Sequence, residues 1–124
     1  MRRTIRLIAF ALAALFAATA CTPEELALYL DTTDEVRDAV SNEGLHRLRT
    51  CESTDNYAAV SRSGTYRGAY QFDQTTWNDV AGRFFPFLVG VDPADAAPWW
   101  QDSMARALWS ERGSQPWPHC GRKV

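Results

Sequence analysis

The apolar residues of the second half of the chain have the regular spacing of a packed domain, and two cysteines, Cys51 and Cys120, lie near the two ends of this segment. This segment, residues 42–121, is roughly eighty residues long, a size at which a hydrophobic core alone is marginally stable. A bond between the two sulfurs would close almost the whole segment in one loop and stabilise it by about 4 kcal/mol in the chain-entropy model. We therefore expect a small domain with a Cys51–Cys120 disulfide, the alternative being two free buried thiols.

Residues 1–20 have the pattern of an export signal. A basic head over 1–6 precedes an uncharged apolar run over 7–18 that is short for a membrane span. Ala18-Thr19-Ala20 then places small residues before a cut at Cys21, which fits ordinary cleavage and also a lipoprotein with lipid on Cys21. An uncleaved anchor helix is a further alternative. We expect an exported protein, in the cell envelope or outside the cell, and a membrane tether if Cys21 is lipidated.

Composition narrows the classes of function and partner. The 124 residues carry a net charge of only −2, so no strong basic field is available to hold nucleic acid. Three cysteines and two histidines without a CxxC pair leave little room for a metal site. We expect a monomer with no metal, no cofactor and no nucleic-acid partner. The expected organisation is a signal peptide over 1–20, a spacer over 21–41 with a transient helix that ends near Leu30, the domain over 42–121 and a tail over 122–124.

Capping residues predict three helices in the domain. These helices run from Ser41 or Asn42 to about Ser53, from Gln74 after an Asp73 cap to about Gly82, and from Pro98 to Arg112 before Gly113. Residues 57–72 predict a small irregular β-hairpin, residues 84–91 a loop that crosses the core, and residues 115–120 an extended closing strap. The expected fold class is α+β, mostly helical, with a short β-hairpin and one disulfide.

Glu52 is the acidic residue with the clearest chemical potential. It follows Cys51 and lies near the C-terminal end of its predicted helix, where the negative end of the helix dipole disfavours a carboxylate. Nearby tyrosine and tryptophan side chains would exclude water. Both effects raise the pKa of a carboxyl group, which suits a general acid. The alternative is a surface glutamate at a helix end.

Aromatic residues give a second indication, because sugars stack on aromatic faces. The tyrosines and tryptophans of the domain are Tyr57, Tyr66, Tyr70, Trp77, Trp99, Trp100, Trp109 and Trp117. A glycan-binding cleft would combine such rings with amide, carboxylate and hydroxyl side chains. For Trp100, Trp109 and Trp117 we favour the alternative that the rings fill the core. The histidines are expected to be unremarkable, His46 as an exposed helix residue and His119 as a residue of the strap.

Four blocks of residues occur in order between the two cysteines. They are Cys51-Glu52-Ser53, Asn56-Tyr57, the run from Tyr66 to Trp77 (YRGAYQFDQTTW) and Trp117-Pro118-His119-Cys120. Together they resemble the resuscitation-promoting factor domain of actinobacteria, a transglycosylase-like branch of the lysozyme superfamily. Glu52-Ser53 and Gly68-Ala69-Tyr70-Gln71 also resemble the Glu-Ser and Gly-Leu-Met-Gln signatures of lytic transglycosylases. The resemblance covers about residues 44–121.

The resemblance implies a small lysozyme-like fold with a cleft between a helical body and a short hairpin. It implies that Glu52 is the catalytic acid, that Cys51–Cys120 is the family disulfide and that Thr76 is the cleft threonine. Other residues expected to contact sugar or shape the cleft are Asn56, Tyr66, Gln71 and Asp73. The chain departs from the family in three places: Gly68-Ala69 replaces a pair of glycines, residues 83–97 are longer and more apolar, and Arg112 replaces a frequent glutamine.

The implied function is cleavage of the β-1,4 bond between N-acetylmuramic acid and N-acetylglucosamine in peptidoglycan glycan strands. Glu52 would protonate the leaving oxygen while the acetamido group of the substrate stabilises C1. The ionised Glu52 would then activate the muramyl 6-hydroxyl, as in a lytic transglycosylase, or water, as in a muramidase, and both outcomes stay open. A second carboxylate is not expected, because Asp55 is interpreted as a turn residue and Asp73 as a helix cap or sugar contact.

Two other functions remain as alternatives. A noncatalytic glycan-binding lipoprotein on the same fold would keep the aromatic cleft without turnover. A secreted regulator would bind a protein partner through the apolar segment 84–88, which is otherwise an ordinary loop that covers the core.

Overall fold

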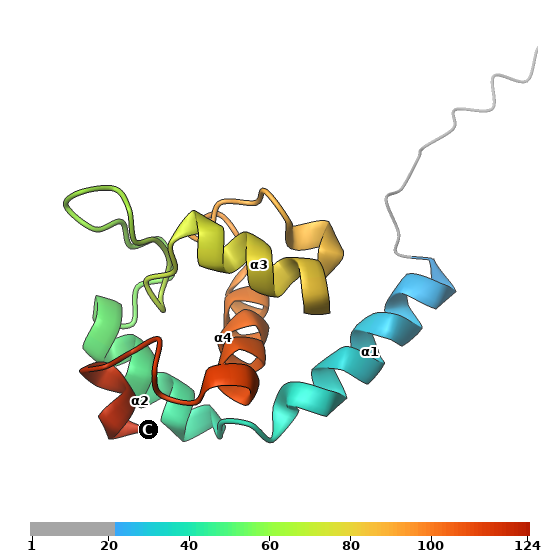
Figure 1. The fold of residues 1–124 in the computed structure, drawn as a ribbon, viewed down its shortest axis with the longest axis horizontal. Coiled ribbons are helices and arrows are strands. Elements are labelled where there is room, and N and C mark those ends of the chain that lie inside the picture. The colour runs from blue at the N-terminus through green and yellow to red at the C-terminus, as the bar shows by residue number, and fades with distance from the viewer. Residues whose placement is uncertain (1–21) are drawn as a thin grey trace, which may run out of the picture.

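The computed structural model describes residues 22–124 of the chain, which form helices joined by loops, the longest of them over residues 54–73 (Figure 1). The elements are α1 (Pro23–Arg37), α2 (Asn42–Ser53), α3 (Gln74–Phe84), the 3-10 helix η1 (Pro86–Leu88), α4 (Pro98–Arg112) and the 3-10 helix η2 (Cys120–Lys123). No helix among the described residues is both long enough and apolar enough to cross a bilayer. The predicted export signal and the fate of Cys21 lie outside the described residues.

The predicted helix starts are confirmed, and each has a local cause. α2 begins after Ser41, whose Oγ accepts a hydrogen bond from the Gly44 backbone nitrogen at 3.0 Å. Asp73 caps α3 in the same manner. α4 begins at Pro98, whose fixed φ suits a first helical turn, and ends at Gly113, which has a φ of 57°.

α1 is longer than the sequence predicts. The helix was expected to end near Leu30, whereas it continues to Arg37. Tyr29 packs edge-on against Trp100 of α4 with ring centroids 4.6 Å apart, and Val36 is only 1% exposed. Packing against α4 therefore stabilises an acidic stretch whose own helical signal is weak. The second half of the segment predicted as a spacer thus contributes side chains to the core.

α4 lies at the centre of the core. Figure 1 shows α1, α2 and α3 arranged around it. Met104 and Leu108 are almost fully buried on one face of α4, as their four-residue spacing predicts. Arg106 on the same helix donates a hydrogen bond to the Val40 carbonyl oxygen at 3.1 Å, which fixes α4 to the connection between α1 and α2.

Residues 57–72 form a loop without regular strands. Its ladder contacts are two isolated antiparallel bridges, Val60 with Arg67 and Arg67 with Phe72. The described residues therefore contain no β-sheet, and the predicted β-hairpin is unconfirmed. The chain turns at Gly68, which has a φ of 80°, and a Cβ there would lie 2.5 Å from the Gln101 Oε1. The same Oε1 accepts a hydrogen bond from the next backbone nitrogen, so the buried Gln101 holds this turn in place.

The segment after α3 crosses the core as predicted. Phe85 and Leu88 are buried, and the Trp77 Nε1 donates a hydrogen bond to the Leu88 carbonyl oxygen at 2.9 Å. Phe87 is exposed at 57%, with its ring edge-on to Trp100. The segment therefore serves mainly as a cover for the core.

The predicted disulfide is confirmed, and the strap before it differs from the prediction. Cys51 and Cys120 are bonded, with their Cα atoms 5.6 Å apart. The strap is a series of turns and is not extended, because the Trp117 nitrogen donates to the Ser114 carbonyl oxygen and the Gly121 nitrogen donates to the Trp117 carbonyl oxygen. Helix η2 follows directly and packs against α2. The end of the chain is thus fixed beside the end of α2.

Candidate active site

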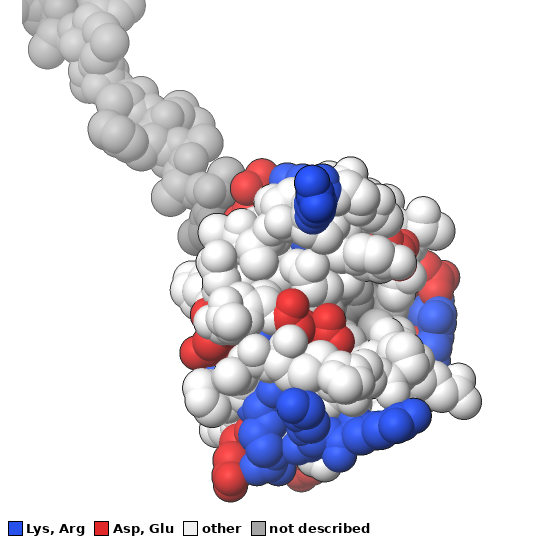
Figure 2. Space-filling view, turned by 90° about the vertical axis from the view of Figure 1, so that its left-hand side faces the viewer, with Lys and Arg blue, Asp and Glu red and all other residues white. Residues whose placement is uncertain are grey.

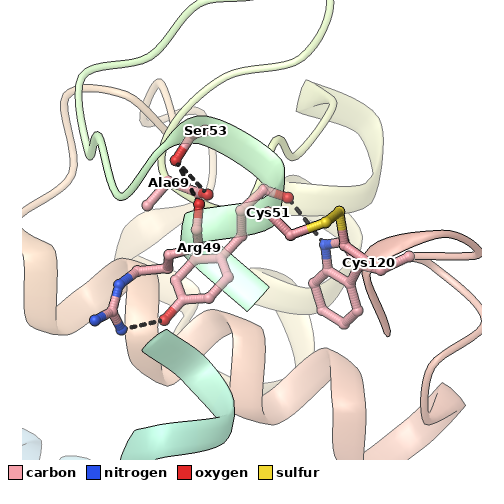
Figure 3. The surroundings of a disulfide bond; sticks show 7 residues. Arg49, Cys51, Ser53, Ala69 and Cys120 are labelled. Atoms are coloured by element: carbon pink, nitrogen blue, oxygen red, sulfur yellow. Dashed lines mark hydrogen bonds between the residues drawn. A yellow bond between two sulfur atoms is a disulfide. The ribbon is translucent and has the colours of Figure 1, made fainter. Parts of the chain in front are cut away.

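Glu52 lies in the last turn of α2, where two contacts fix the backbone. The neighbouring Cys51 is bonded to the strap through the disulfide. The Oγ of Ser53 donates a hydrogen bond to the Ala69 carbonyl oxygen at 2.8 Å, which joins α2 to the loop over residues 57–72 (Figure 3). The helix then ends in a left-handed turn at Thr54, with a φ of 56°. Glu52 is therefore held on a rigid element between the strap and the loop.

A groove lies beside Glu52 and consists of two adjoining cavities. The first, of about 320 Å³, is lined by Glu52, Tyr66, Gln71, Pro116, Trp117, Pro118 and His119. The second, of about 230 Å³, is lined by Tyr66, Tyr70, Gln71, Phe72, Asp73, Thr76, Leu108, Arg112, Pro116 and Trp117. The two cavities share four lining residues, so they form one continuous depression. Figure 2 shows a face of the molecule with acidic side chains beside a central hollow and basic side chains gathered along one edge.

The carboxyl group of Glu52 is half-buried and has no hydrogen-bond or ion-pair partner among residues 22–124. Burial raises its pKa, because desolvation disfavours the charged form, and the positive charge of His119 opposes this shift. The raised pKa agrees in direction with the sequence prediction, and exclusion of water is its main cause. Such a carboxyl group can keep a proton to a higher pH than a surface glutamate and can donate it to a bound molecule.

Four of the predicted sugar-contact residues line the groove. Tyr66 is about half exposed, and Gln71 adopts a left-handed φ of 54° with its Nε2 donating to the Gly68 carbonyl oxygen at 3.0 Å. Asp73 accepts hydrogen bonds from the backbone nitrogen and the hydroxyl of Thr76, both at 2.8 Å. The groove therefore presents an amide, a phenol and a hydroxyl beside a carboxylate that is already engaged as a helix cap.

Asn56 is not among the residues that line the groove. Its Oδ1 accepts a hydrogen bond from the Ala58 backbone nitrogen at 3.0 Å, and its own nitrogen donates to the Ser53 Oγ. These bonds close the turn after α2. The structure therefore gives Asn56 a local role and does not bring it together with Gln71 and Thr76.

Among the lining residues that sequence reasoning did not assign to the site are Arg112, Pro116 and His119. His119 was interpreted only as a strap residue. A signal was present in the chain, because His119 precedes the cysteine that bonds to the neighbour of Glu52. Arg112 was noted only as a departure from the family pattern, and its guanidinium donates to Asp79 at 3.0 Å.

Trp117 forms the floor of the groove and is a core residue at the same time. It is 4% exposed, its ring stacks on Trp109 with centroids 5.9 Å apart, and its Nε1 donates to the Tyr70 carbonyl oxygen at 2.9 Å. The favoured interpretation of Trp117 and Trp109 as core-filling rings therefore agrees with the packing. Only part of the Trp117 ring faces the cavities.

A polar cluster lies behind the end of α2, and we call it the Asp102 cluster. The Oδ1 of Asp102 accepts hydrogen bonds from the hydroxyls of Tyr70, at 2.5 Å, and Tyr57, at 2.9 Å. Arg49 adds a longer bond to the same oxygen at 3.3 Å and one to the Tyr70 hydroxyl at 3.0 Å. Figure 3 shows Arg49 on the same helix as Cys51. The cluster therefore joins α2, the loop and α4 behind the groove.

Metal chemistry has no visible basis in the described part of the chain. Residues 22–124 contain no group of three histidine, cysteine or acidic side chains placed to hold a metal ion.

The sequence is similar to those of curated proteins from staphylococci. The chain is 36% identical over 76 residues to the probable transglycosylase SceD of Staphylococcus aureus (strain MRSA252), a match that covers 61% of this chain and 32% of the relative. It is 34% identical over 76 residues to the probable transglycosylase SceD of Staphylococcus haemolyticus (strain JCSC1435), with 61% and 31% covered. The chain thus matches about a third of the length of these curated relatives. The profile of the transglycosylase-like domain matches residues 39–120, and the chain therefore belongs to that family.

Proposed function

We propose that the chain cleaves the β-1,4 bond between N-acetylmuramic acid and N-acetylglucosamine in peptidoglycan, with Glu52 as the general acid. The observation that carries this proposal is the half-buried, unpartnered Glu52 carboxyl group at the wall of an open groove. Membership of the transglycosylase-like family and the name of the staphylococcal relatives support the reaction class. We also infer a lysozyme-like arrangement of helices around the groove.

In the proposed reaction Glu52 supplies the proton. It protonates the glycosidic oxygen, the bond between C1 and that oxygen breaks, and the acetamido group of the substrate stabilises the positive charge at C1. The Glu52 carboxylate then takes a proton from the muramyl 6-hydroxyl or from water, and the oxygen that loses the proton bonds to C1 as the acetamido oxygen leaves C1. Attack by the 6-hydroxyl gives an anhydro product, and attack by water gives a reducing end. Glu52 returns to its protonated state in both cases, so the cycle closes.

The neighbouring carboxylates favour this single-acid scheme. Glycosidases with two carboxylates need the second one free to act as base or nucleophile. Asp55 accepts a hydrogen bond from the Arg49 Nε at 2.7 Å, and both oxygens of Asp73 accept bonds from Thr76. Each of these acids therefore has a structural task, and neither faces the groove with an unoccupied oxygen pair.

Substrate binding is assigned to the groove beyond Glu52. Tyr66 offers an exposed ring for stacking, and Gln71 and Thr76 offer polar groups for the hydroxyl and acetamido groups of a sugar. We propose that the chain acts as an exported monomer on glycan strands, and that a lipid on Cys21, if it is added, tethers it to a membrane.

The test is digestion of purified peptidoglycan by the wild-type chain and by Glu52→Gln. The variant keeps the shape of the side chain and removes its proton, so we expect at least about a 100-fold loss of soluble muropeptides. Glu43→Gln is the matched control, because Glu43 lies on the same helix, is 81% exposed and pairs with Arg47. We expect it to keep full activity.

Mass spectrometry of the released ends decides the product. Anhydromuramyl ends identify a lytic transglycosylase, and reducing ends identify a muramidase. A wild-type chain that binds glycan strands without releasing any product would contradict the proposal and favour the noncatalytic binder. Undiminished turnover by Glu52→Gln would contradict the assignment of the acid.

A further inference from the structure

His119 and Glu52 flank the same disulfide on its two sides. Glu52 follows Cys51 in the sequence, and His119 precedes Cys120. The bond holds the two cysteine Cα atoms 5.6 Å apart. Both Glu52 and His119 line the cavity of about 320 Å³. The crosslink therefore brings an imidazole into the cavity of the candidate acid, although the two residues are far apart in the sequence.

The two side chains face the same space without direct contact. Neither a hydrogen bond nor an ion pair within 4 Å joins Glu52 to His119. Both side chains line the cavity in which a substrate would bind. Their charges still interact, because the positive charge of His119 favours the ionised form of Glu52 and lowers its pKa against the effect of burial.

We propose that His119 is a positioning residue for the acid, whose positive charge stabilises the Glu52 carboxylate that forms when the proton is transferred. This inference rests on the proposed function. In the step, the Glu52 proton moves to the leaving oxygen, and the resulting negative charge faces the imidazolium. In this role His119 neither gives nor takes a proton in the reaction. It makes Glu52 a stronger acid and a weaker base.

Other charged groups near the groove are engaged elsewhere or lie further away. Among the described residues that line the Glu52 cavity, His119 is the only one that can carry a positive charge, and Tyr66 is the other titratable neighbour. In the adjoining cavity Arg112 pairs with Asp79, while Asp73 accepts the two Thr76 bonds.

Cations behind the disulfide belong to a different cavity. Arg47 and Lys123 line that cavity together with His46, which lies 3.6 Å from Asp55. Arg49 on the same helix pairs with Asp55 and Asp102. Among these cations, His119 is thus the one whose charge interacts with Glu52.

The first test measures the ionisation of Glu52 directly and needs no activity. Carbon-13 NMR follows the Glu52 carboxyl group through a pH titration, with the signal assigned by its absence in Glu52→Gln. His119→Gln removes the positive charge, so the pKa of Glu52 is expected to rise above its wild-type value. His119→Lys retains a positive charge and is expected to return the pKa of Glu52 toward its wild-type value. His46→Gln is the matched control and is expected to leave the titration unchanged.

The second test measures turnover against pH with the same variants. Glu52 acts in its protonated form, so activity falls as pH rises through its pKa. We expect the alkaline limb of kcat/KM to move to higher pH in His119→Gln, to return in His119→Lys and to stay in place in His46→Gln. At low pH, where Glu52 is protonated in every variant, His119→Gln should lower kcat several-fold with little change in KM.

The outcomes separate this inference from the proposed function. A Glu52 titration that is identical in wild type and His119→Gln would overturn the role of His119 and leave the role of Glu52 intact. An equal fall in kcat at every pH, with an unmoved alkaline limb, would also overturn it, because that is the signature of a merely structural residue. Turnover by Glu52→Gln would overturn the proposed function whatever the titration shows.

Discussion

Glu52 and Asp102 are two carboxyl groups on opposite sides of the end of α2, and their surroundings differ. Asp102 is 25% exposed and lies in a cluster in which Tyr57, Tyr70 and Arg49 all donate to one of its oxygens. Glu52 is half-buried beside an open groove and accepts no hydrogen bond from any described residue. Both positions remove water from an acid, but only the Asp102 cluster replaces the lost hydrogen bonds.

We interpret this difference as that between an acid with a structural role and the acid proposed for catalysis. Burial and the bonds to Asp102 raise the pKa of both Tyr57 and Tyr70, so these hydroxyls stay protonated and remain donors in ordinary conditions. The cluster therefore links α2, the loop and α4 through hydrogen bonds that share one oxygen of Asp102. No described residue hydrogen-bonds to the Glu52 carboxyl group, which is half-buried at the wall of the groove, so a ligand in the groove can bond to its oxygens.

Removal of the disulfide is expected to have the largest effect on stability. It loosens the region around Glu52 and leaves the Asp102 cluster in place. The double variant Cys51→Ser with Cys120→Ser should lower the free energy of unfolding by about 4 kcal/mol, because the unfolded chain is no longer closed in a long loop. Chemical denaturation monitored by tryptophan fluorescence checks this value.

Amide exchange would locate the effect of the same double variant. Exchange at the strap nitrogens of Trp117 and Gly121 should increase more than exchange in α4, because the strap loses its link to α2 while the Asp102 cluster remains. An unchanged unfolding free energy, or an equal increase of exchange throughout, would contradict the view that the disulfide fixes mainly the wall of the groove.

The Asp102 cluster is expected to show the next largest effect. Asp102→Ala leaves two buried hydroxyls and the Arg49 guanidinium without their shared acceptor, which should destabilise the fold by about 2–3 kcal/mol. Asp79→Ala is the matched control, since Asp79 also pairs with two arginines, Arg83 and Arg112, but at the surface. Thermal unfolding compares the two, and an equal loss in both variants would remove the distinction between the cluster and a surface network.

Local signals explain what the sequence could predict. Ser41, Asp73, Pro98 and Gly113 are caps whose effect depends on neighbouring backbone groups, so the starts of α2, α3 and α4 and the end of α4 followed from the sequence. The disulfide followed from the domain size and the position of two cysteines. Glu52 was selected because its position after Cys51 is also a local feature.

The missed features all depend on contacts between distant segments. The second half of α1 is helical because Val36 packs against the core. The residue pattern of this acidic stretch does not predict that contact. Asp102 was not singled out, because its partners Tyr57 and Tyr70 lie more than thirty positions away in the chain. His119 was dismissed for the same reason, since only the disulfide brings it to the Glu52 cavity.

The smallest expected effect is a pH dependence of stability that distinguishes Glu52 from an acid that accepts hydrogen bonds from other side chains. The pKa of Glu52 is raised by burial in the folded chain, so the folded state binds a proton more tightly than the unfolded state. Stability should therefore decrease as pH rises from the pKa of an unfolded glutamate through the higher folded value. Glu52→Gln removes this decrease. Relative to wild type, the variant should therefore be more stable at neutral pH than at acidic pH, and unfolding free energies measured across that interval check this. If wild type and variant instead kept a constant difference across the interval, Glu52 would be solvated like any surface acid, and its contrast with Asp102 would rest on hydrogen bonding alone.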